Sequence, residues 1–112
     1  MQLTASQVRY LLAIADLSQK KTPVSSSDIA DKLQVTRPSV NKMLSVLSEK
    51  KLLEKRRYGT VNLTALGVEI SGDCGKRVSL LSDKLAGALG FAPDDSKRCS
   101  IILVSEMPDL AL

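Results

Sequence analysis

Residues 25–47 limit the fold of this chain most strongly, because they contain two helix starts only a few residues apart. Ser25-Ser26-Ser27-Asp28 offers several N-cap residues for a short helix. Gln34-Val35 leave room only for a tight turn, and Thr36 is then the N-cap of a further helix. Pro38 falls in the first turn of that helix, where its missing amide costs nothing. The segment therefore predicts two helices joined by a tight turn.

Two short strands are predicted next, Leu52-Leu53-Glu54-Lys55 and Thr60-Val61-Asn62-Leu63. Arg56-Arg57-Tyr58-Gly59 joins them as a turn, in which Gly59 can take a positive φ. Because a two-stranded ribbon is marginally stable alone, it must pack against the helices. With a further helix before residue 25, these elements follow the order of a winged helix-turn-helix: helix, short helix, tight turn, helix and hairpin. We therefore expect a mainly α fold with a two-stranded β wing.

Further helices are predicted on both sides of this segment. Thr4 and Gln7 form a capping box for a helix that runs to about Gln19. Thr64 caps a long helix that ends near Leu89. This helix contains four glycines, each of which lowers its stability, so we expect it to pack closely against another surface. Apolar residues at spacings of three and four form a narrow seam on the long helix, which we expect to serve dimerisation: Leu66, Ile70, Cys74, Val78, Leu81 and Leu85.

The chain should divide into a winged helix-turn-helix domain, residues 1–63, and a helical dimerisation region, residues 64–112. Within the second region, Gly90-Phe91-Ala92-Pro93 should end the long helix. Ile101-Ile102-Leu103-Val104 is apolar and β-branched, so both helix and strand are open there, and we favour helix.

Positive charge is concentrated in one fifth of the sequence. Residues 36–58 hold seven basic and two acidic residues, a net charge of +5, whereas the whole chain carries +4. Such a cluster suits a polyanion, because neutralising phosphates and releasing their counterions drives binding. The partner expected from this pattern is double-stranded DNA.

The first turns of a recognition helix reach base edges in the major groove, and a wing can follow the backbone or enter the minor groove. Arg can pair with guanine and Asn with adenine. A merely solvated helix face and a solubilising charged turn are the alternatives. The expected DNA-binding residues are Ser27, Thr36, Arg37, Pro38, Ser39, Asn41, Lys42, Lys55, Arg56, Arg57 and Tyr58.

Catalysis is not expected. The sequence contains no His, no Gly-rich phosphate loop and no Cys-x-x-Cys motif, so an enzyme active site has few candidate residues. No cofactor is expected. The N-terminus lacks the layout of a signal peptide and no stretch could cross a membrane, so we expect a cytoplasmic protein. Cys74 and Cys99 are expected to be ordinary, partly buried thiols; a redox switch is the alternative.

Four segments carry a resemblance to a known family: residues 27–33 (SDIADKL), 35–40 (VTRPSV), 47–53 (LSEKKLL) and 63–67 (LTALG). Together they resemble the metal-dependent repressors of the diphtheria toxin repressor and manganese transport regulator family, over about residues 7–90. The multiple antibiotic resistance regulators share the last element and are the second choice. The resemblance implies a recognition helix beginning at Arg37, a wing around Arg57 and Tyr58, and a long helix from Thr64 that pairs with its copy in a homodimer.

The metal site of that family is not expected here. The resemblance places the ligand positions near Arg9, Leu12, Val78 and Ser100–Val104, where the side chains are unsuited to a transition metal. Glu69, Asp73 and Cys74 are close in sequence, but a site there would also need Cys99. We therefore expect a DNA-binding regulator without a metal, acting as a repressor by default.

Other functions remain open from the sequence. A winged helix can serve as a protein-interaction module, although the basic cluster argues against this. A regulator of the multiple antibiotic resistance type would instead sense a small molecule between wing and long helix. The sequence identifies no such effector.

Overall fold

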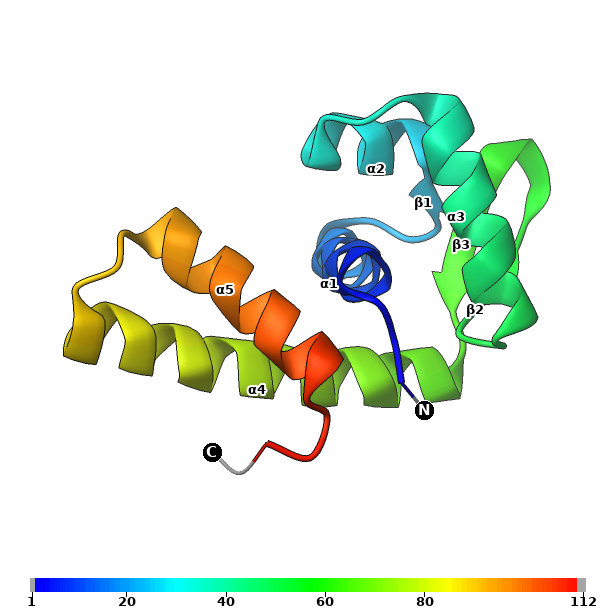
Figure 1. Cartoon of the computed structure of the whole chain (residues 1–112). Helices are drawn as coiled ribbons and strands as arrows, with labels where there is room; N and C mark the ends of the chain where they lie inside the picture. Colours follow the sequence, from blue (N-terminus) through cyan, green and yellow to red (C-terminus); the bar gives the residue numbers. More distant parts are fainter. Residues whose placement is uncertain (1, 111–112) are drawn as a thin grey trace. The chain divides into compact units, whose positions relative to one another are not determined.

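The computed structural model describes residues 2–110. Its elements, in order, are α1 (Ala5–Lys20), β1 (Val24–Ser25), α2 (Ser26–Leu33), α3 (Arg37–Glu49), β2 (Leu53–Lys55), a 3₁₀ turn η1 (Arg57–Gly59), β3 (Thr60–Leu63), α4 (Ala65–Leu89) and α5 (Pro93–Glu106) (Figure 1). Tyr10–Ser71 form one compact unit, and the residues up to Arg9 together with those from Gly72 onwards form a second. The predicted division at residue 63 concerns function and stays a prediction.

The unit Tyr10–Ser71 is a winged helix-turn-helix, as the sequence predicts. Its sheet differs from the expectation, because it has three antiparallel strands in the order β1-β3-β2 instead of two. In the expected hairpin, Leu53 pairs with Leu63 and Lys55 with Val61. The additional strand, β1, pairs Val24 with Val61 and so covers the free edge of β3. The hairpin is therefore anchored to the helical body on that edge.

A core of aliphatic side chains holds the elements of this unit together. The three buried residues of α3 are spaced by four and three, which places them on one face of that helix. β2 and β3 contribute Leu53 and Val61, which are 2% and 1% exposed. Fully or nearly fully buried are Leu11, Ile14, Val24, Ile29, Val40, Leu44, Leu47, Leu52, Leu53 and Val61.

The helix starts are the ones that local sequence signals predict. The Thr4 amide donates to Gln7 Oε1 (3.0 Å) and the Gln7 amide donates to Thr4 Oγ1 (3.1 Å), which is the predicted capping box. Thr36 caps α3 by accepting from the Ser39 amide (3.3 Å). Gln34, with φ of 56°, takes the left-handed conformation that ends α2 and turns the chain towards α3.

The start of α4 fits tightly against the beginning of β2. Thr64 Oγ1 donates to the Lys51 carbonyl (2.7 Å) and accepts from the Gly67 amide (3.0 Å). A Cβ at Gly67 would overlap the Leu52 carbonyl group. The close packing predicted from the glycines is thus found at Gly67. It is not found at Gly72 or Gly87, whose Cβ positions have nothing within 4 Å among the described residues.

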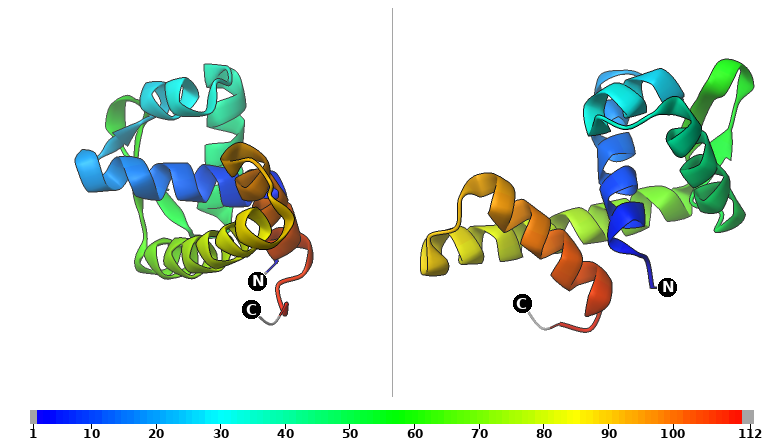
Figure 2. Two further views of the ribbon diagram at one scale, coloured as in Figure 1. Left: turned by 90° about the vertical axis from the view of Figure 1, so that its left-hand side faces the viewer. Right: turned by 45° about the horizontal axis from the view of Figure 1, so that its top comes forward.

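In the second unit, α5 folds back along α4 after a short loop (Figures 1 and 2). Gly90, with φ of 68°, ends α4, and Pro93 begins α5. The segment that could have been helix or strand is helix. One face of α5 is buried, with Ile101 and Val104 only 5% and 4% exposed. Within residues 2–110, no helix is long and apolar enough to span a membrane.

Candidate nucleic-acid interface

The first turns of α3 present a row of exposed polar side chains. The buried residues of α3 turn inward, and the residues before Val40, together with Asn41 and Lys42, are exposed. The Thr36 hydroxyl donates to Ser39 Oγ (2.9 Å) and orders the start of the helix. All six side chains predicted to reach DNA from this end are exposed: Thr36, Arg37, Pro38, Ser39, Asn41 and Lys42.

The hairpin between β2 and β3 forms the wing and carries the other cluster of predicted residues. Lys55, Arg56, Arg57 and Tyr58 are all exposed, and the Tyr58 side chain is 95% exposed. The Thr60 hydroxyl donates to the Arg57 carbonyl (2.8 Å), which closes the turn. Tyr58 itself has φ of 60°. An aromatic residue rarely adopts this left-handed conformation, so the turn holds the ring outward at some cost in free energy.

A hydrogen bond joins the wing to α3. Lys55 Nζ donates to Ser45 Oγ (2.6 Å), and the Ser45 hydroxyl donates to the Asn41 carbonyl (3.2 Å). Arg56 is held differently, by an ion pair with Glu54 at 3.1 Å in which both side chains are more than half exposed. Ser45 was not among the predicted site residues, although it lies one helical turn after Asn41 on the same face of α3. This spacing was the signal that could have identified it.

The N-terminus of α2 carries negative charge beside the predicted contact Ser27, which is partly exposed. Hydrogen bonding by Ser25 and the Lys21 ammonium, 3.7 Å from Asp28 Oδ2, lower the pKa of the Asp28 carboxyl. Asp28 is thus ionised at neutral pH and occupies the helix end that would otherwise attract a phosphate. The surroundings of Ser27 are therefore less favourable for a phosphate than the start of α3, whose first turn holds no acidic residue.

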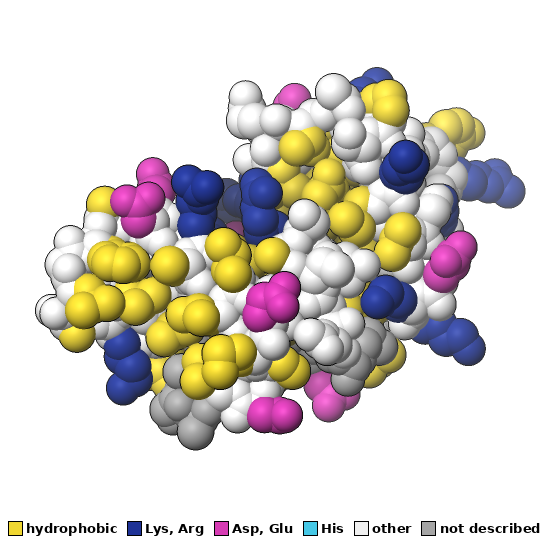
Figure 3. Space-filling view, viewed as in Figure 1, with side chains coloured by type: hydrophobic (Ala, Val, Ile, Leu, Met, Phe, Trp, Pro, Cys, Tyr) yellow, Lys and Arg dark blue, Asp and Glu magenta, His cyan; other side chains and the backbone are white. Residues whose placement is uncertain are grey.

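In Figure 3, Lys and Arg side chains lie along the part formed by α3 and the hairpin and also over α5, and hydrophobic side chains lie over α4 and α5 and also beside α2 and α3. A hollow of about 530 Å³ lies between the end of α1, the hairpin and the start of α4. Glu54, Arg56 and Asn62 from the hairpin and Val68 from α4 are among its lining residues.

The residues predicted for dimerisation do not share one environment. Val78 and Leu81 are buried within the chain at 5% and 8% exposure. Ile70, Cys74 and Leu85 are partly buried, and Leu66 is 39% exposed. Burial raises the pKa of the Cys74 thiol, and the adjacent Asp73 adds to this effect. Cys74 and Cys99 are both free and partly buried. The dimerisation role of the seam stays a prediction.

The positions at which the resemblance would place metal ligands do not offer a donor set that suits a transition metal. Arg9 is exposed on α1, and Val78, Ser100 and Val104 are buried on α4 and α5. These side chains provide no imidazole, thiolate or carboxylate. Within residues 2–110, no group of three or more Asp, Glu, Cys or His side chains is placed to hold a metal ion.

The fold and the exposed basic surface define the class of protein, a winged helix-turn-helix DNA-binding protein. Residues 2–61 match the model of the iron dependent repressor, N-terminal DNA binding domain, which is more than half of the chain. The chain therefore belongs to the iron-dependent repressor family. Residues 2–61 are thus the part of the chain that corresponds to the DNA-binding domain of this family. No curated protein matches the sequence significantly.

Solved structures share the fold over nearly all of the chain. The manganese regulator SloR is 22% identical, with a TM-score of 0.74 over 96% of this chain and 48% of SloR. IdeR from T. acidophilum is 20% identical, with a TM-score of 0.74 over 97% of this chain and 51% of IdeR. A mutant of MepR from a multidrug resistant S. aureus clinical isolate is 23% identical, with a TM-score of 0.61 over 97% of this chain and 82% of MepR. The chain thus spans about half the length of SloR and IdeR.

Proposed function

We propose that the chain is a sequence-specific repressor that reads duplex DNA with the first turns of α3. One observation carries this proposal: all six candidate residues from Thr36 to Lys42 are exposed together at the start of a single helix. Arg37 can donate two hydrogen bonds to guanine, and Asn41 can exchange two with adenine. These side chains can therefore discriminate bases as well as bind phosphates.

The wing supplies contacts that depend less on sequence. Arg56 and Arg57 follow the backbone or enter a narrow minor groove, where the negative potential is strongest. The hydrogen bond between Lys55 and Ser45 supports this arrangement, because it fixes the base of the wing to the helix that reads the bases. The wing and α3 then contact DNA together.

The regulator acts as a homodimer, because one recognition helix reads only one half-site. Two copies related by a two-fold axis recognise two half-sites about one helical turn of DNA apart, or a multiple of that spacing. Binding to the operator then depends on dimer formation as well as on the residues of α3.

Regulation is independent of a transition metal. The side chains at the family's ligand positions support this part of the proposal, because Arg9, Leu12, Val78 and the residues Ser100–Val104 are poor ligands. DNA affinity is then the same with and without added manganese.

A titration of fluorescent duplex DNA with purified protein tests the proposal, at two salt concentrations and with and without Mn²⁺. We expect the affinity to fall steeply as salt rises, since phosphate contacts release counterions. A competing duplex of scrambled sequence, once an operator has been selected from a random pool, separates specific from non-specific binding.

Each outcome separates one interpretation from the others. Binding only with Mn²⁺ would overturn metal independence and direct attention to the acidic residues and cysteines. Absence of DNA binding in all conditions would contradict the proposal and favour a protein-interaction module, whose apolar contacts depend little on salt.

A further inference from the structure

The side chain of Lys55 lies at the junction between the wing and α3. Lys55 is the last residue of β2, and β2 packs against α3. Its Nζ donates to Ser45 Oγ at 2.6 Å. The Ser45 hydroxyl uses its own proton on the Asn41 carbonyl, at 3.2 Å, so its oxygen is free to accept from the ammonium group. The ammonium group is therefore held beside the exposed face of α3, one helical turn beyond the residue proposed to pair with adenine.

The charge of Lys55 is available to an anion. Its neighbour on the wing, Arg56, is paired with the Glu54 carboxylate at 3.1 Å. Lys55 forms no ion pair within residues 2–110, and the partner that holds it is a neutral hydroxyl. An ammonium group has three donors, so two remain after the bond to Ser45. Lys55 can thus bind a phosphate without giving up an ion pair.

The hydrogen bond also prepares Lys55 for binding. A free lysine side chain samples many rotamers, and fixing it on a ligand costs conformational entropy. Ser45 is partly buried on a helix, so the position of its hydroxyl is set by the backbone of α3. Part of the entropy of Lys55 is already lost in the free protein, and less is lost when a phosphate arrives.

We infer that Lys55 binds a DNA phosphate at the junction between α3 and the wing, and that Ser45 is the positioning residue for this contact. The inference rests on the proposed function, in which α3 reads bases and the wing follows the backbone. A strand that borders the groove occupied by α3 and continues along the wing passes this junction. A phosphate contact is blind to base identity, so it strengthens binding to every duplex and leaves discrimination to the start of α3.

Lys55→Met tests the phosphate contact, because it removes the charge and keeps an unbranched side chain. We expect binding to become about fivefold to tenfold weaker for operator and scrambled duplexes alike. The slope of log affinity against log salt concentration should become shallower by about 1.

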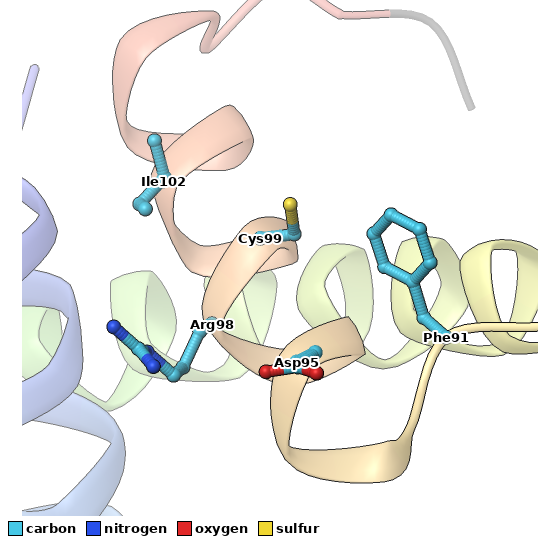
Figure 4. A pocket seen from close by; sticks show the side chains of 5 residues that line it. All are labelled: Phe91, Asp95, Arg98, Cys99 and Ile102. Carbon is cyan, nitrogen blue, oxygen red and sulfur yellow. The ribbon is translucent and has the colours of Figure 1, made fainter.

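Arg98→Met is the matched control for the loss of one positive charge. Arg98 is exposed on α5, outside the unit Tyr10–Ser71, and lines a hollow together with Phe91, Cys99 and Ile102 (Figure 4). This variant has the same net charge as Lys55→Met and should bind both duplexes as the wild type does. Weakening by both variants to the same degree would mean that net charge alone is responsible, and would overturn the inference.

Substitutions of Ser45 test its positioning role. Ser45→Ala removes the hydroxyl, and we expect binding about twofold to fivefold weaker for both duplexes. In the Lys55→Met background the same substitution should have no further effect, because both changes remove one contact. Ser45→Thr keeps the hydroxyl and should bind close to wild type. Ser45→Val has the shape of Thr without the hydroxyl and should resemble Ser45→Ala.

Fluorescence titrations with the two duplexes measure these affinities, and far-UV circular dichroism checks that each variant is folded. If wild-type protein binds the operator and the Ser45 and Lys55 variants bind it equally well, the inference fails and the proposed function stands. The same holds if the effects of the two substitutions simply add. A loss of operator binding alone in Ser45→Ala would also overturn the inference, because Ser45 would then act on base reading by α3. Wild-type protein that binds no DNA would remove the proposed function, and this inference with it.

Discussion

The segment from α2 to β3 and the segment from α4 to α5 differ in how many large apolar side chains they expose to solvent. In the first, Tyr58 at the wing tip is the exposed large apolar residue, and the exposed charges are mainly basic. In the second, five large apolar side chains of the two helices are exposed: Leu66, Val68, Leu80, Leu89 and Ile102. Scattered exposed apolar residues are common on any protein, but their number differs between the two segments. The basic surface of the first segment suits the proposed contact with DNA, and the exposed apolar side chains of the second suit the proposed contact with a second copy of the chain.

Truncation of a leucine in each segment should give the largest contrast. Leu47→Ala leaves a cavity at a fully buried position of α3, and we expect a loss of about 2–5 kcal/mol in the free energy of unfolding. Leu80→Ala, at a side chain that is 45% exposed, should change it by less than about 0.5 kcal/mol. Urea unfolding of dilute protein measures both. A large effect of Leu80→Ala at high protein concentration alone would show that a second subunit covers this position.

Gly67→Ala should show that the start of α4 is packed more tightly than the rest of that helix. The added methyl group would meet the Leu52 carbonyl, so backbone must shift, and overpacking of this kind costs about 1–3 kcal/mol. Thermal unfolding followed by circular dichroism measures the loss. An unchanged melting temperature would mean that α4 and β2 are not in close contact at this point.

Substitutions of two arginines test the proposed contact of the first segment with DNA. Arg37→Ala should reduce discrimination between operator and non-operator DNA by about 1–3 kcal/mol, if Arg37 contacts a base. Arg56→Ala should weaken binding to all sequences similarly, since a phosphate contact is lost. The slope of log affinity against log salt concentration should become shallower by about 1. Fluorescence titrations at several salt concentrations distinguish these results, with Lys84→Ala on α4 as the control. If neither arginine matters, the recognition helix and wing have been assigned wrongly.

Gly87→Ala should give the smallest effect and the opposite sign from Gly67→Ala. Nothing in the described chain lies within 4 Å of the added Cβ, so the gain in helix propensity should stabilise the protein by about 1 kcal/mol. Thermal unfolding measures this change also. Destabilisation would indicate that another molecule packs against this part of α4.

Much of the fold could be predicted because its signals are local. Thr4 with Gln7, Thr36 with Pro38, and Thr64 each mark a helix start through contacts with residues at most four positions away. The hairpin was predicted from Gly59 and the alternating strands beside it. Strand β1 was missed, because two residues carry too little pattern and become a strand only by pairing with β3. The left-handed backbone conformation of Tyr58 was not predicted either, because the geometry of the turn overrides the preference of an aromatic residue for negative φ.

The candidate DNA site was predicted as a set of residues but not as a connected surface. Exposure of Arg37, Asn41 and Lys42 follows from the spacing of the buried residues in α3. The link between Lys55 and Ser45 joins residues ten positions apart, and only the packing of the wing against α3 creates it.

The sequence by itself determined where the first four helices begin, where positive charge gathers, and that α4 has an apolar seam. These properties depend on neighbours along the chain, through capping hydrogen bonds, periodicity and charge density. Only the tertiary structure decided that Val78 and Leu81 are buried in the chain and that Ile102 is not. Periodicity reveals that a helix has an apolar face, but burial depends on which distant segment reaches that face, and this is set by the packing of the whole chain.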